Sequence, residues 1–572
     1  MPLPARHYST LNYDVWLYIA SFLTLQELWN ARFLNEVVFG VAMDAGYQVV
    51  HVPTDYRHFE GFTQWFPRFY GADVGHRVRT IHFSPLAALR KSSWDQGRRT
   101  RASINDDLVP QERVLSFYQK LLQQSATTKP TMPTNPKLPT KPTQPTMSNR
   151  RLSMLARIKH RLQGIFPVKP QLSPEQTFQM SVAQFSAVSN IIVDLHYWER
   201  AGEIFPPVEF GMPSFMIKAS SSNLKSLSLN VPISMALCFL SEAPHYPNLE
   251  KLSIEKQIWE WYDESQTETP SETWIQPLAT FINRHADTLL SLALRLPIQG
   301  SNFAPGPYPA PSSPSGPHIS SIFKNFDKIP NLVHLSLHLF RDTDPQGLRQ
   351  FLRRQTRTLR KLELILEKNL SYIGADQVLA IVRDSLVHCR LSSLSIQYRI
   401  DNDEWQRSKD EPNTRMASAL GLIRNSITQS NLTSLEISGY YTTLLPAELR
   451  EILEMRGGIR RLRHLALRVQ VMTADMFDLI VSELPALQSL DLTACAFKGR
   501  SSYYRDWEQD FALEMKTRTY ADWGLQSLKL AVASEQPSLS GGIAVRGLVH
   551  ALPNVHTFNG LSRSEYLSQL ID

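Results

Sequence analysis

The chain has 572 residues, of which 42% are apolar and 20% are charged, and its formal net charge is +7. This length exceeds what one compact core supports, so we expect several domains or one repetitive solenoid, and the apolar fraction excludes wholesale disorder. The three cysteines, Cys238, Cys389 and Cys495, are too few and too widely spaced for a disulfide framework or a zinc knuckle, which indicates a reducing compartment.

The N-terminal part of the chain, residues 1–50, predicts a small helical domain. Apolar side chains recur at helical spacing between residues 11 and 39, and they are Leu11, Val15, Ile19, Phe22, Leu23, Leu28, Phe33 and Leu34. Thr24 is a suitable N-cap between two of the expected helices. Residues 51–112 are expected to form a connector. It contains the sequence HRVRTIHF, in which residues 78–83 are expected to form the first strand of the solenoid.

Residues 113–174 are predicted to be a basic, proline-rich insertion. They contain eleven Lys or Arg and no Asp or Glu, whereas the remainder has 49 basic and 53 acidic residues. Prolines recur at every third position from 130 to 145, which favours an extended polyproline spacer. Residues 150–166 then predict a basic amphipathic helix that docks on the body or stays solvated; an anionic membrane or a partner groove is the alternative.

Two serines follow arginines in the pattern that basophilic kinases prefer. Ser103 ends the string RRTRAS and Ser153 ends RRLS. Both are candidate phosphorylation sites, and a phosphate on Ser153 would neutralise part of the basic helix. Because such short strings also occur by chance, we treat them only as candidates.

Residues 175–572 contain a repeat. Ten segments match Leu-x-x-Leu-x-Leu/Ile, and they begin at Leu224, Leu249, Leu289, Leu332, Leu359, Leu391, Leu432, Leu462, Leu487 and Leu525. Weaker copies are expected at IVDLHY, through Ile192, Leu195 and Tyr197, and at NVHTF, through Val555 and Phe558. Helical patterns separate the copies, and a second proline-rich loop is expected at 300–317. Strand, loop and helix should therefore alternate along this part of the chain.

This repeat resembles the leucine-rich repeat family. The resemblance implies parallel strands on a concave face, helices on a convex face and motif leucines that point into the stack. The copies are 25 to 43 residues apart, so the solenoid should be irregular. The fold class expected from the whole chain is α/β: an N-terminal α-helical domain followed by this solenoid.

The N-terminal segment resembles an F-box. The matching positions are Leu11, Asp14, Val15, Ile19, Phe22, Leu23, Glu27, Leu28 and Arg32, although Asn12 stands where proline is usual and the Cys-Lys ending is absent. The resemblance implies a substrate receptor of a Skp-Cullin-F-box ubiquitin ligase, which is not itself an enzyme. It would contact a Skp-type adaptor, and a cullin through it, by seven residues: Leu11, Val15, Leu17, Ile19, Leu23, Leu25 and Leu28. The alternative is a repeat scaffold whose F-box is degenerate and which has no role in ubiquitination.

No catalytic chemistry is expected from the motifs of the chain. It lacks a nucleotide-binding glycine fingerprint, a Walker loop, a zincin motif and a nucleophile elbow, so we expect no cofactor and no metal. His334 and His338 should lie on one face of a strand as exposed side chains rather than as metal ligands. Without a signal peptide or a run of 18 apolar residues, we expect a soluble cytoplasmic or nuclear protein that binds no membrane and no nucleic acid.

The target of the receptor is predicted to bind on loops that follow certain strands. The strand residues beside the motif leucines are mostly small, so the concave floor offers few anchors. The loops carry aromatic residues among carboxylates, and these are Trp259, Trp261, Tyr262, Trp274, Trp405, Tyr503, Tyr504 and Trp507. Aromatic faces and carboxylates favour a basic segment of a target protein. The alternative is that these aromatic residues merely pack the loops onto the stack.

Overall fold

The computed structural model of the chain describes its regular elements and the turns between many of them. The described residues are 15, 18–20, 22–31, 36–53, 75–84, 185–194, 211–231, 236, 239–241, 243–255, 272–295, 319–339, 344–368, 372–400, 417–429, 431–439, 444–455, 459–497, 507–532 and 542–569. The chain divides into two compact units. Unit 1 comprises Met1–Ser189 and Gly202–Ser220, and unit 2 comprises Asn190–Ala201 and Ser221–Asp572.

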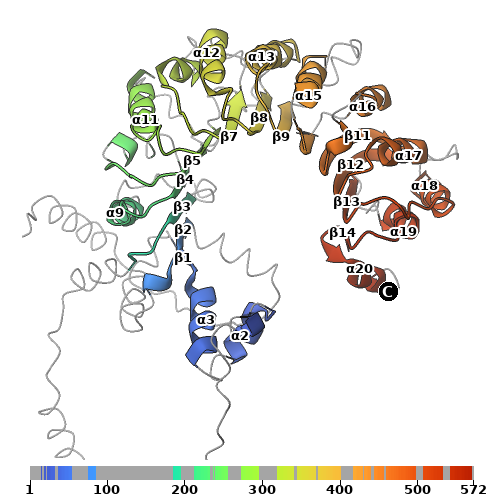
Figure 1. Ribbon diagram of the computed structural model, residues 1–572, viewed down its shortest axis with the longest axis horizontal. Coiled ribbons are helices and arrows are strands. Elements are labelled where there is room, and N and C mark those ends of the chain that lie inside the picture. The colour runs from blue at the N-terminus through green and yellow to red at the C-terminus, as the bar shows by residue number, and fades with distance from the viewer. Residues whose placement is uncertain are drawn as a thin grey trace, which may run out of the picture. The chain divides into compact units, whose positions relative to one another are not determined.

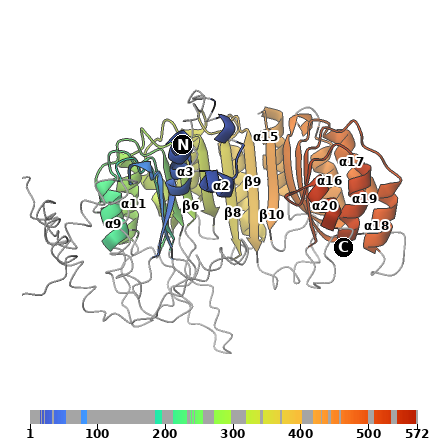
Figure 2. The ribbon, with the colours of Figure 1, turned by 90° about the horizontal axis from the view of Figure 1, so that it is seen from below.

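Unit 2 is built from parallel strands that follow one another in the order of the sequence. They are β3 (Asn190–Asp194), β4 (Ser226–Asn230), β5 (Lys251–Glu255), β6 (Ser291–Arg295), β7 (His334–Leu339), β8 (Lys361–Lys368), β9 (Ser393–Ile400), β10 (Ser434–Gly439), β11 (His464–Met472), β12 (Ser489–Phe497), β13 (Ser527–Val532) and β14 (Thr557–Phe558). Figure 2 shows β6, β8, β9 and β10 running side by side. The expected parallel strands are therefore confirmed.

All ten copies of the leucine motif lead into one of these strands. Each strand from β4 to β13 begins two residues after the first leucine of a copy, as Ser226 follows Leu224. The first, fourth and sixth positions of every copy are buried, with at most 4% of each side chain exposed. Because alternate strand residues face opposite sides of a sheet, the leucines cover one face and leave the other to the residues between them.

Helices cover the leucine face of unit 2. They are α11 (Glu272–Arg284), α12 (Pro345–Gln355), α13 (Tyr372–Ser385), α15 (Ala417–Gln429), α16 (Pro446–Leu453), α17 (Ala474–Glu483), α18 (Trp507–Lys516) and α19 (Gly542–Ala551), with the 3-10 turns η5 (Ile319–Asn325) and η6 (Ile459–Arg461). Figure 1 shows these helices on the outer side of a curved sheet and the strands on the inner side. The core of unit 2 lies between the two layers, so an isolated strand and helix would leave half of their apolar surface exposed.

Side-chain hydrogen bonds hold neighbouring turns of unit 2 together. Asn248, directly before the first leucine of its copy, donates from Nδ2 to the carbonyl oxygen of Ser222 in the preceding repeat, at 2.7 Å. Asn331 donates to the carbonyl oxygen of Asp287 at the same distance. Both acceptors stand two residues before the first leucine of the preceding copy. These asparagines therefore bind loop carbonyls that the strand ladder leaves open.

The two weaker copies have different outcomes. Val555 and Phe558 are buried, and Phe558 pairs with Leu528 of β13, which confirms the copy near the C-terminus. The register expected for Ile192 is wrong, because in β3 Ile191 and Val193 are the buried residues. Ile191 pairs with Leu227 of β4, so Ile192 lies on the opposite, inner face. The copy begins at Val188 instead, because Val188, Ile191 and Val193, at its first, fourth and sixth positions, are all buried.

A hairpin ends the series of parallel strands. Asn559 and Gly560 have φ values of 51° and 84° and connect β14 to β15 (Leu561–Ser562), which runs antiparallel. An Asn-Gly pair is the preferred sequence for such a two-residue turn, since both positions need positive φ. Helix α20 (Arg563–Gln569) follows, and its Arg563 donates to the carbonyl oxygens of Leu552 and Val549 at 2.7 and 2.8 Å. The hairpin and Arg563 cap the end of unit 2.

The described part of unit 1 contains three helices and a pair of parallel strands. Its described elements are α2 (Leu25–Ala31), α3 (Glu36–Tyr47), β1 (Val49–Pro53), the 3-10 turn η2 (Gly75–Arg77), β2 (Thr80–Ser84) and α9 (Gly211–Ala219). Strand β2 lies where a strand is expected near 78–83, but β1 precedes it and pairs with it, so β2 is not the first strand. Arg77 donates to the carbonyl oxygen of Gly40 at 3.0 Å and contacts Asp44, which ties η2 to α3.

Candidate functional site

The helical residues of unit 1 share a buried apolar cluster. Ala20, Leu28 and Ala42 are buried together, and Leu23 and Val41 pack against them partly exposed. Leu28 lies on α2 and Ala42 on α3, while Ala20 belongs to the helical residues that precede α2. Other apolar side chains of the same helical residues are exposed and form an apolar surface.

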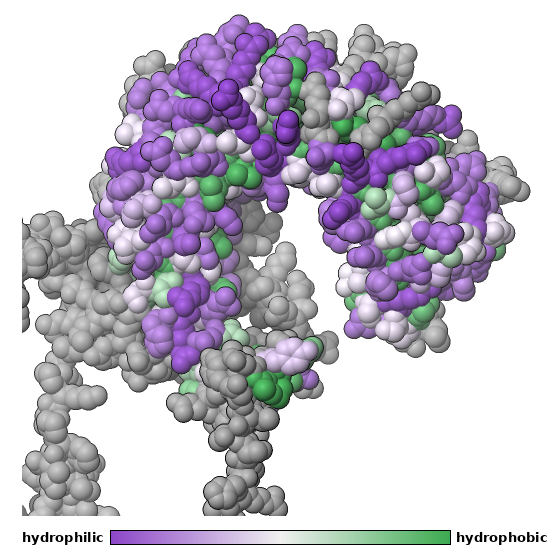
Figure 3. All heavy atoms as spheres, viewed as in Figure 1, coloured by the Kyte–Doolittle hydropathy of each residue, from purple (hydrophilic) through white to green (hydrophobic). Residues whose placement is uncertain are grey.

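The exposed part of this surface is a set of four side chains before α2. Val15, Tyr18, Ile19 and Phe22 are 41, 68, 37 and 69% exposed, and we call them the 15–22 patch. Their spacing of three and four residues places them on one side of a helical segment. The rings of Tyr18 and Phe22 meet edge to face, with centroids 4.8 Å apart. Figure 3 shows hydrophobic side chains at the surface of this part of unit 1. An exposed apolar cluster of this kind is typical of a protein-binding surface.

A capping box orients the segment that follows the 15–22 patch. The backbone N–H of Thr24 donates to the Glu27 carboxylate at 2.7 Å, and the N–H of Glu27 donates to Thr24 Oγ1 at 3.3 Å. The N-cap expected at Thr24 is thus confirmed. The hydrogen bond from the Thr24 backbone is the main cause that lowers the pKa of Glu27 below its usual value. The box fixes where α2 begins and therefore how the patch meets α2.

The seven residues predicted to contact an adaptor do not all lie on one surface. Val15 and Ile19 belong to the 15–22 patch, and Leu23 is partly buried beside the core. Leu28 is 6% exposed and packs inside the buried cluster, so it is not part of the exposed patch. Leu25 lies on α2, and nothing is described of its side chain; Leu11 and Leu17 lie outside the described residues. Tyr18 and Phe22 were missed, although their spacing from Val15 and Ile19 could have indicated them.

The inner face of unit 2 presents its side chains in rows that cross the strands. Paired residues of successive strands form the first row, which we call the donor row: Asn190, Ser226, Lys251, Ser291, His334, Lys361, Ser393, Ser434, His464, Ser489, Ser527 and Thr557. None of these residues is buried, and none is acidic. Every side chain in the row can donate a hydrogen bond.

Two and four residues further along the strands, the inner face carries charged groups of both signs. The Arg295 guanidinium on β6 donates from one nitrogen to both carboxylate oxygens of Glu363 on β8, each at 3.0 Å. It also lies 3.5 Å from the carboxylate of Glu255 on β5. Gln397 on β9 donates to Glu363 at 3.2 Å, and Arg295 Nε donates to the Ser336 hydroxyl at 3.4 Å. One polar network therefore links β5, β6, β7, β8 and β9.

The two histidines of β7 have different surroundings. His334 is half-buried and its Nδ1 lies 3.1 Å from the hydroxyl of Ser291. Burial is the main cause that lowers the pKa of His334, and Lys361, Arg295 and Lys251 add to it while Glu363 opposes it. His338 is only 5% exposed, so the expectation of two exposed histidines is wrong for this one. Among the described residues no group of three or more His, Cys, Asp or Glu is arranged to hold a metal ion.

The residues predicted to grip a target cannot be placed on a surface. Trp259, Trp261, Tyr262, Trp405, Tyr503 and Tyr504 lie outside the described residues, as do Ser103 and Ser153, the 150–166 segment and the 300–317 loop. Trp274 lies in α11 and Trp507 begins α18, and nothing is described of their side chains. The loop site therefore stays a prediction.

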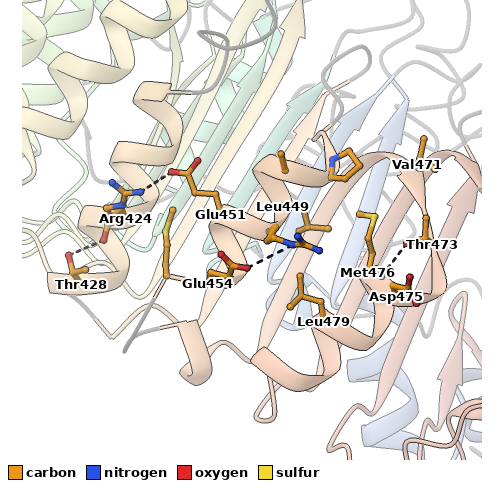
Figure 4. A pocket seen from close by; sticks show the side chains of 14 residues that line it. Arg424, Thr428, Leu449, Glu451, Glu454, Val471, Thr473, Asp475, Met476 and Leu479 are labelled. Atoms are coloured by element: carbon orange, nitrogen blue, oxygen red, sulfur yellow. Dashed lines mark hydrogen bonds and ion pairs between the residues drawn. The ribbon is translucent and has the colours of Figure 1, made fainter.

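A cleft of about 990 Å³ opens on the helical side of unit 2, among α15, α16 and α17. Leu449, Met455 and Met476 line it and are each less than 10% exposed. Figure 4 shows Arg424 paired with Glu451 at its rim, where the two groups are 2.8 Å apart. Arg450 lies 3.9 Å from Glu454 at the same rim. Because the rim carries paired charges of both signs, the cleft has no evident preference for a charged ligand.

Comparison with known proteins places the chain in no established group. No family model matches it, and no curated protein matches it. Within the described part of the chain, no helix has the length and apolar character needed to cross a lipid bilayer. The function is therefore inferred from the 15–22 patch, the donor row and the repeats themselves.

Proposed function

We propose that this protein is the substrate receptor of a Skp-Cullin-F-box ubiquitin ligase, with an F-box in unit 1 and leucine-rich repeats in unit 2. The observation that carries the proposal is the 15–22 patch, which exposes apolar side chains at helical spacing beside the buried cluster of Ala20, Leu28 and Ala42. Such a segment gains stability when a partner covers it, because burial of apolar area is favourable at about 25 cal/mol per Å². A Skp-type adaptor is the proposed partner, and a cullin would be bound through it.

The repeats support the second half of the proposal. Unit 2 consists of a curved parallel sheet with helices on its outer side. The inner face of the sheet is polar and accessible. A receptor of this kind needs no catalytic group, because it acts by holding its target close to a ubiquitin-charged enzyme and raising the local concentration. The polar inner face gives such a target a wide surface on which to bind.

Co-expression with a Skp-type adaptor tests the proposal. We expect the full chain and the adaptor to elute together in gel filtration, and we expect the double variant V15E/I19E to elute alone. Two carboxylates in the patch would have to lose their hydration on binding, which is costly without a partner charge. A chain that never elutes with the adaptor would instead support the scaffold without a ubiquitin role.

The matched control replaces two exposed apolar residues of unit 2. Leu513 on α18 and Ile543 on α19 are 53 and 46% exposed, so L513E/I543E adds the same charge at similar exposure. This variant should keep the adaptor. If V15E/I19E retains the adaptor as well as the control does, the F-box assignment is wrong. Circular dichroism of both variants shows whether the repeats remain folded.

A further inference from the structure

The donor row of unit 2 carries accessible cations that have no anion of their own. Lys251 on β5 and Lys361 on β8 are exposed, and within the described residues neither has a carboxylate at ion-pair distance. Their neighbours in the row are Ser226, Ser291, His334 and Ser393, all donors. This row therefore offers positive charge and hydrogen-bond donors to a ligand, without any carboxylate to repel an anion.

The carboxylates nearest to the donor row are already bound. Glu255 and Glu363 share Arg295, and Glu363 also accepts from Gln397. On the other strands, Glu436 accepts from Ser438 at 3.0 Å, and Asp491 lies 3.5 Å from Lys529. Asp194 accepts from Asn230 at 3.0 Å. Glu255, Glu363 and Asp491 thus have a cation nearby, whereas Glu436 and Asp194 accept from neutral groups; among the described residues none of the five lies at ion-pair distance from Lys251 or Lys361.

The spacing of the cations limits what can bind. Three strand intervals separate Lys251 on β5 from Lys361 on β8. Neighbouring strands lie about 4.8 Å apart, so the step between the two lysines is about 14 Å. An extended peptide rises about 3.4 Å per residue, and four residues therefore cover one step. Carboxylates four residues apart in an extended segment would match the positions of the cations.

We propose that the donor row binds an extended acidic segment of a partner protein, with Asp or Glu at about every fourth position. Carboxylates of the segment pair with Lys251 and Lys361, and the serines between them donate to its backbone carbonyls. Small serine side chains let an extended backbone lie close to the strands. The inference rests on the proposed function in one respect: the partner is taken to be a protein that the ligase ubiquitinates.

A nucleic acid fits the same surface less well. Each strand of DNA carries one phosphate per about 3.4 Å of helix axis, whereas formal cations in the donor row lie about 14 Å apart. Most phosphates would face serines rather than lysines. The aromatic loops were predicted to bind a basic segment of the target protein. Those loops lie outside the described residues and are not part of the donor row.

Fluorescence anisotropy with a synthetic peptide tests the inference on the full chain without adaptor. The probe is a fluorescein-labelled peptide of about 13 residues with Glu at every fourth position and Ser or Ala between. At low salt we expect it to bind about tenfold more tightly than a peptide of equal composition with contiguous glutamates, and to weaken as salt is added. Equal binding of the two peptides, or no binding, would overturn the proposal.

Charge reversal shows whether the donor row is the binding site. The variant K251E/K361E should lose about tenfold or more in affinity for the spaced peptide. The control K328E/K516E changes the net charge equally, at two exposed lysines outside the strands, and should stay within about twofold. Equal losses in the two variants would mean unspecific attraction and would refute the site. A single-stranded oligonucleotide that displaces the peptide at lower concentration would refute the ligand class.

Adaptor binding, measured on the same preparations, separates this inference from the proposed function. K251E/K361E should still elute with the adaptor, because both lysines belong to unit 2 and the 15–22 patch belongs to unit 1. Loss of peptide binding with the adaptor retained supports the donor row. If the wild-type chain binds the spaced peptide but no adaptor, the donor row stands as a protein-binding site and the ligase assignment fails.

Discussion

The His285 imidazole accepts a hydrogen bond at Nε2 from the backbone N–H of Tyr246, 3.0 Å away. Its other nitrogen, Nδ1, lies 2.8 Å from the carbonyl oxygen of Phe281 and donates to it. The two bonds select one neutral tautomer, since Nε2 accepts only when it carries no proton. The ring is 1% exposed, and burial is the main cause that lowers the pKa of His285 to about 4.

Acid should therefore destabilise unit 2 through His285. Its pKa lies near 6.5 in the unfolded chain and near 4 in the folded one, so the unfolded state binds more protons between these values. Stability present above pH 6.5 is lost as the pH falls towards 4, by about 2 kcal/mol from this residue. Urea unfolding at pH 7 and pH 4.5 measures the loss. H285Q should be less stable at pH 7 and should lose less on acidification; an unchanged pH dependence in H285Q would contradict the assignment.

The pair of Arg295 and Glu363 should stabilise the stack of β6 to β8. Their side chains are 31 and 17% exposed, and two hydrogen bonds of 3.0 Å join them. We expect R295A and E363A each to lower the free energy of unfolding by about 1 to 2 kcal/mol, with a coupling of about 1 kcal/mol in the double-mutant cycle. Urea titration of the four proteins gives the coupling. Strict additivity would mean that the two residues act independently.

Helices α18 and α19 should not tolerate a methyl group at Gly547. A Cβ on Gly547 would lie 2.6 Å from the backbone of Ala512, which cannot move without shifting α18. G547A should therefore lower the thermal midpoint, at a cost of about 1 to 3 kcal/mol. At Gly524 the nearest atom to such a Cβ is 3.8 Å away, so G524A is the control and should be nearly neutral. Similar midpoints for the two variants would argue against the close helix crossing.

The asparagines before the motif leucines should each stabilise the contact with the preceding repeat. N248A removes the bond to Ser222 and N331A removes the bond to Asp287, and each should cost about 1 kcal/mol. Because the two sites lie in different repeats, the losses should add in N248A/N331A. Thermal unfolding monitored by circular dichroism measures them. N431A is a useful comparison, because Asn431 accepts a bond from Arg461 rather than donating to a preceding loop.

The positions of ten strands of unit 2, and the face of each strand that is buried, follow from the repeated leucine pattern alone. A leucine three residues before another, as Leu224 and Leu227 are, carries this information locally, because stacked repeats bury the same positions each time. The N-cap at Thr24 could also be predicted from the sequence, because its hydrogen-bond partner Glu27 is only three residues away. Strand β1 was missed because VVHVP, with Val50 and Val52 buried, is too short and lacks the leucine pattern.

Contacts between residues far apart in the sequence depend on how the strands and helices pack. Arg295 and Glu363 are 68 positions apart, and their contact depends on the register of β6, β7 and β8. The burial of Leu28 and the exposure of Phe22 depend on how the helices of unit 1 pack, although both fit one apolar pattern in the sequence. Periodicity reports which side of an element is apolar. Which apolar or charged side chain is covered, and by what, is set by the neighbouring elements, which lie far away along the chain.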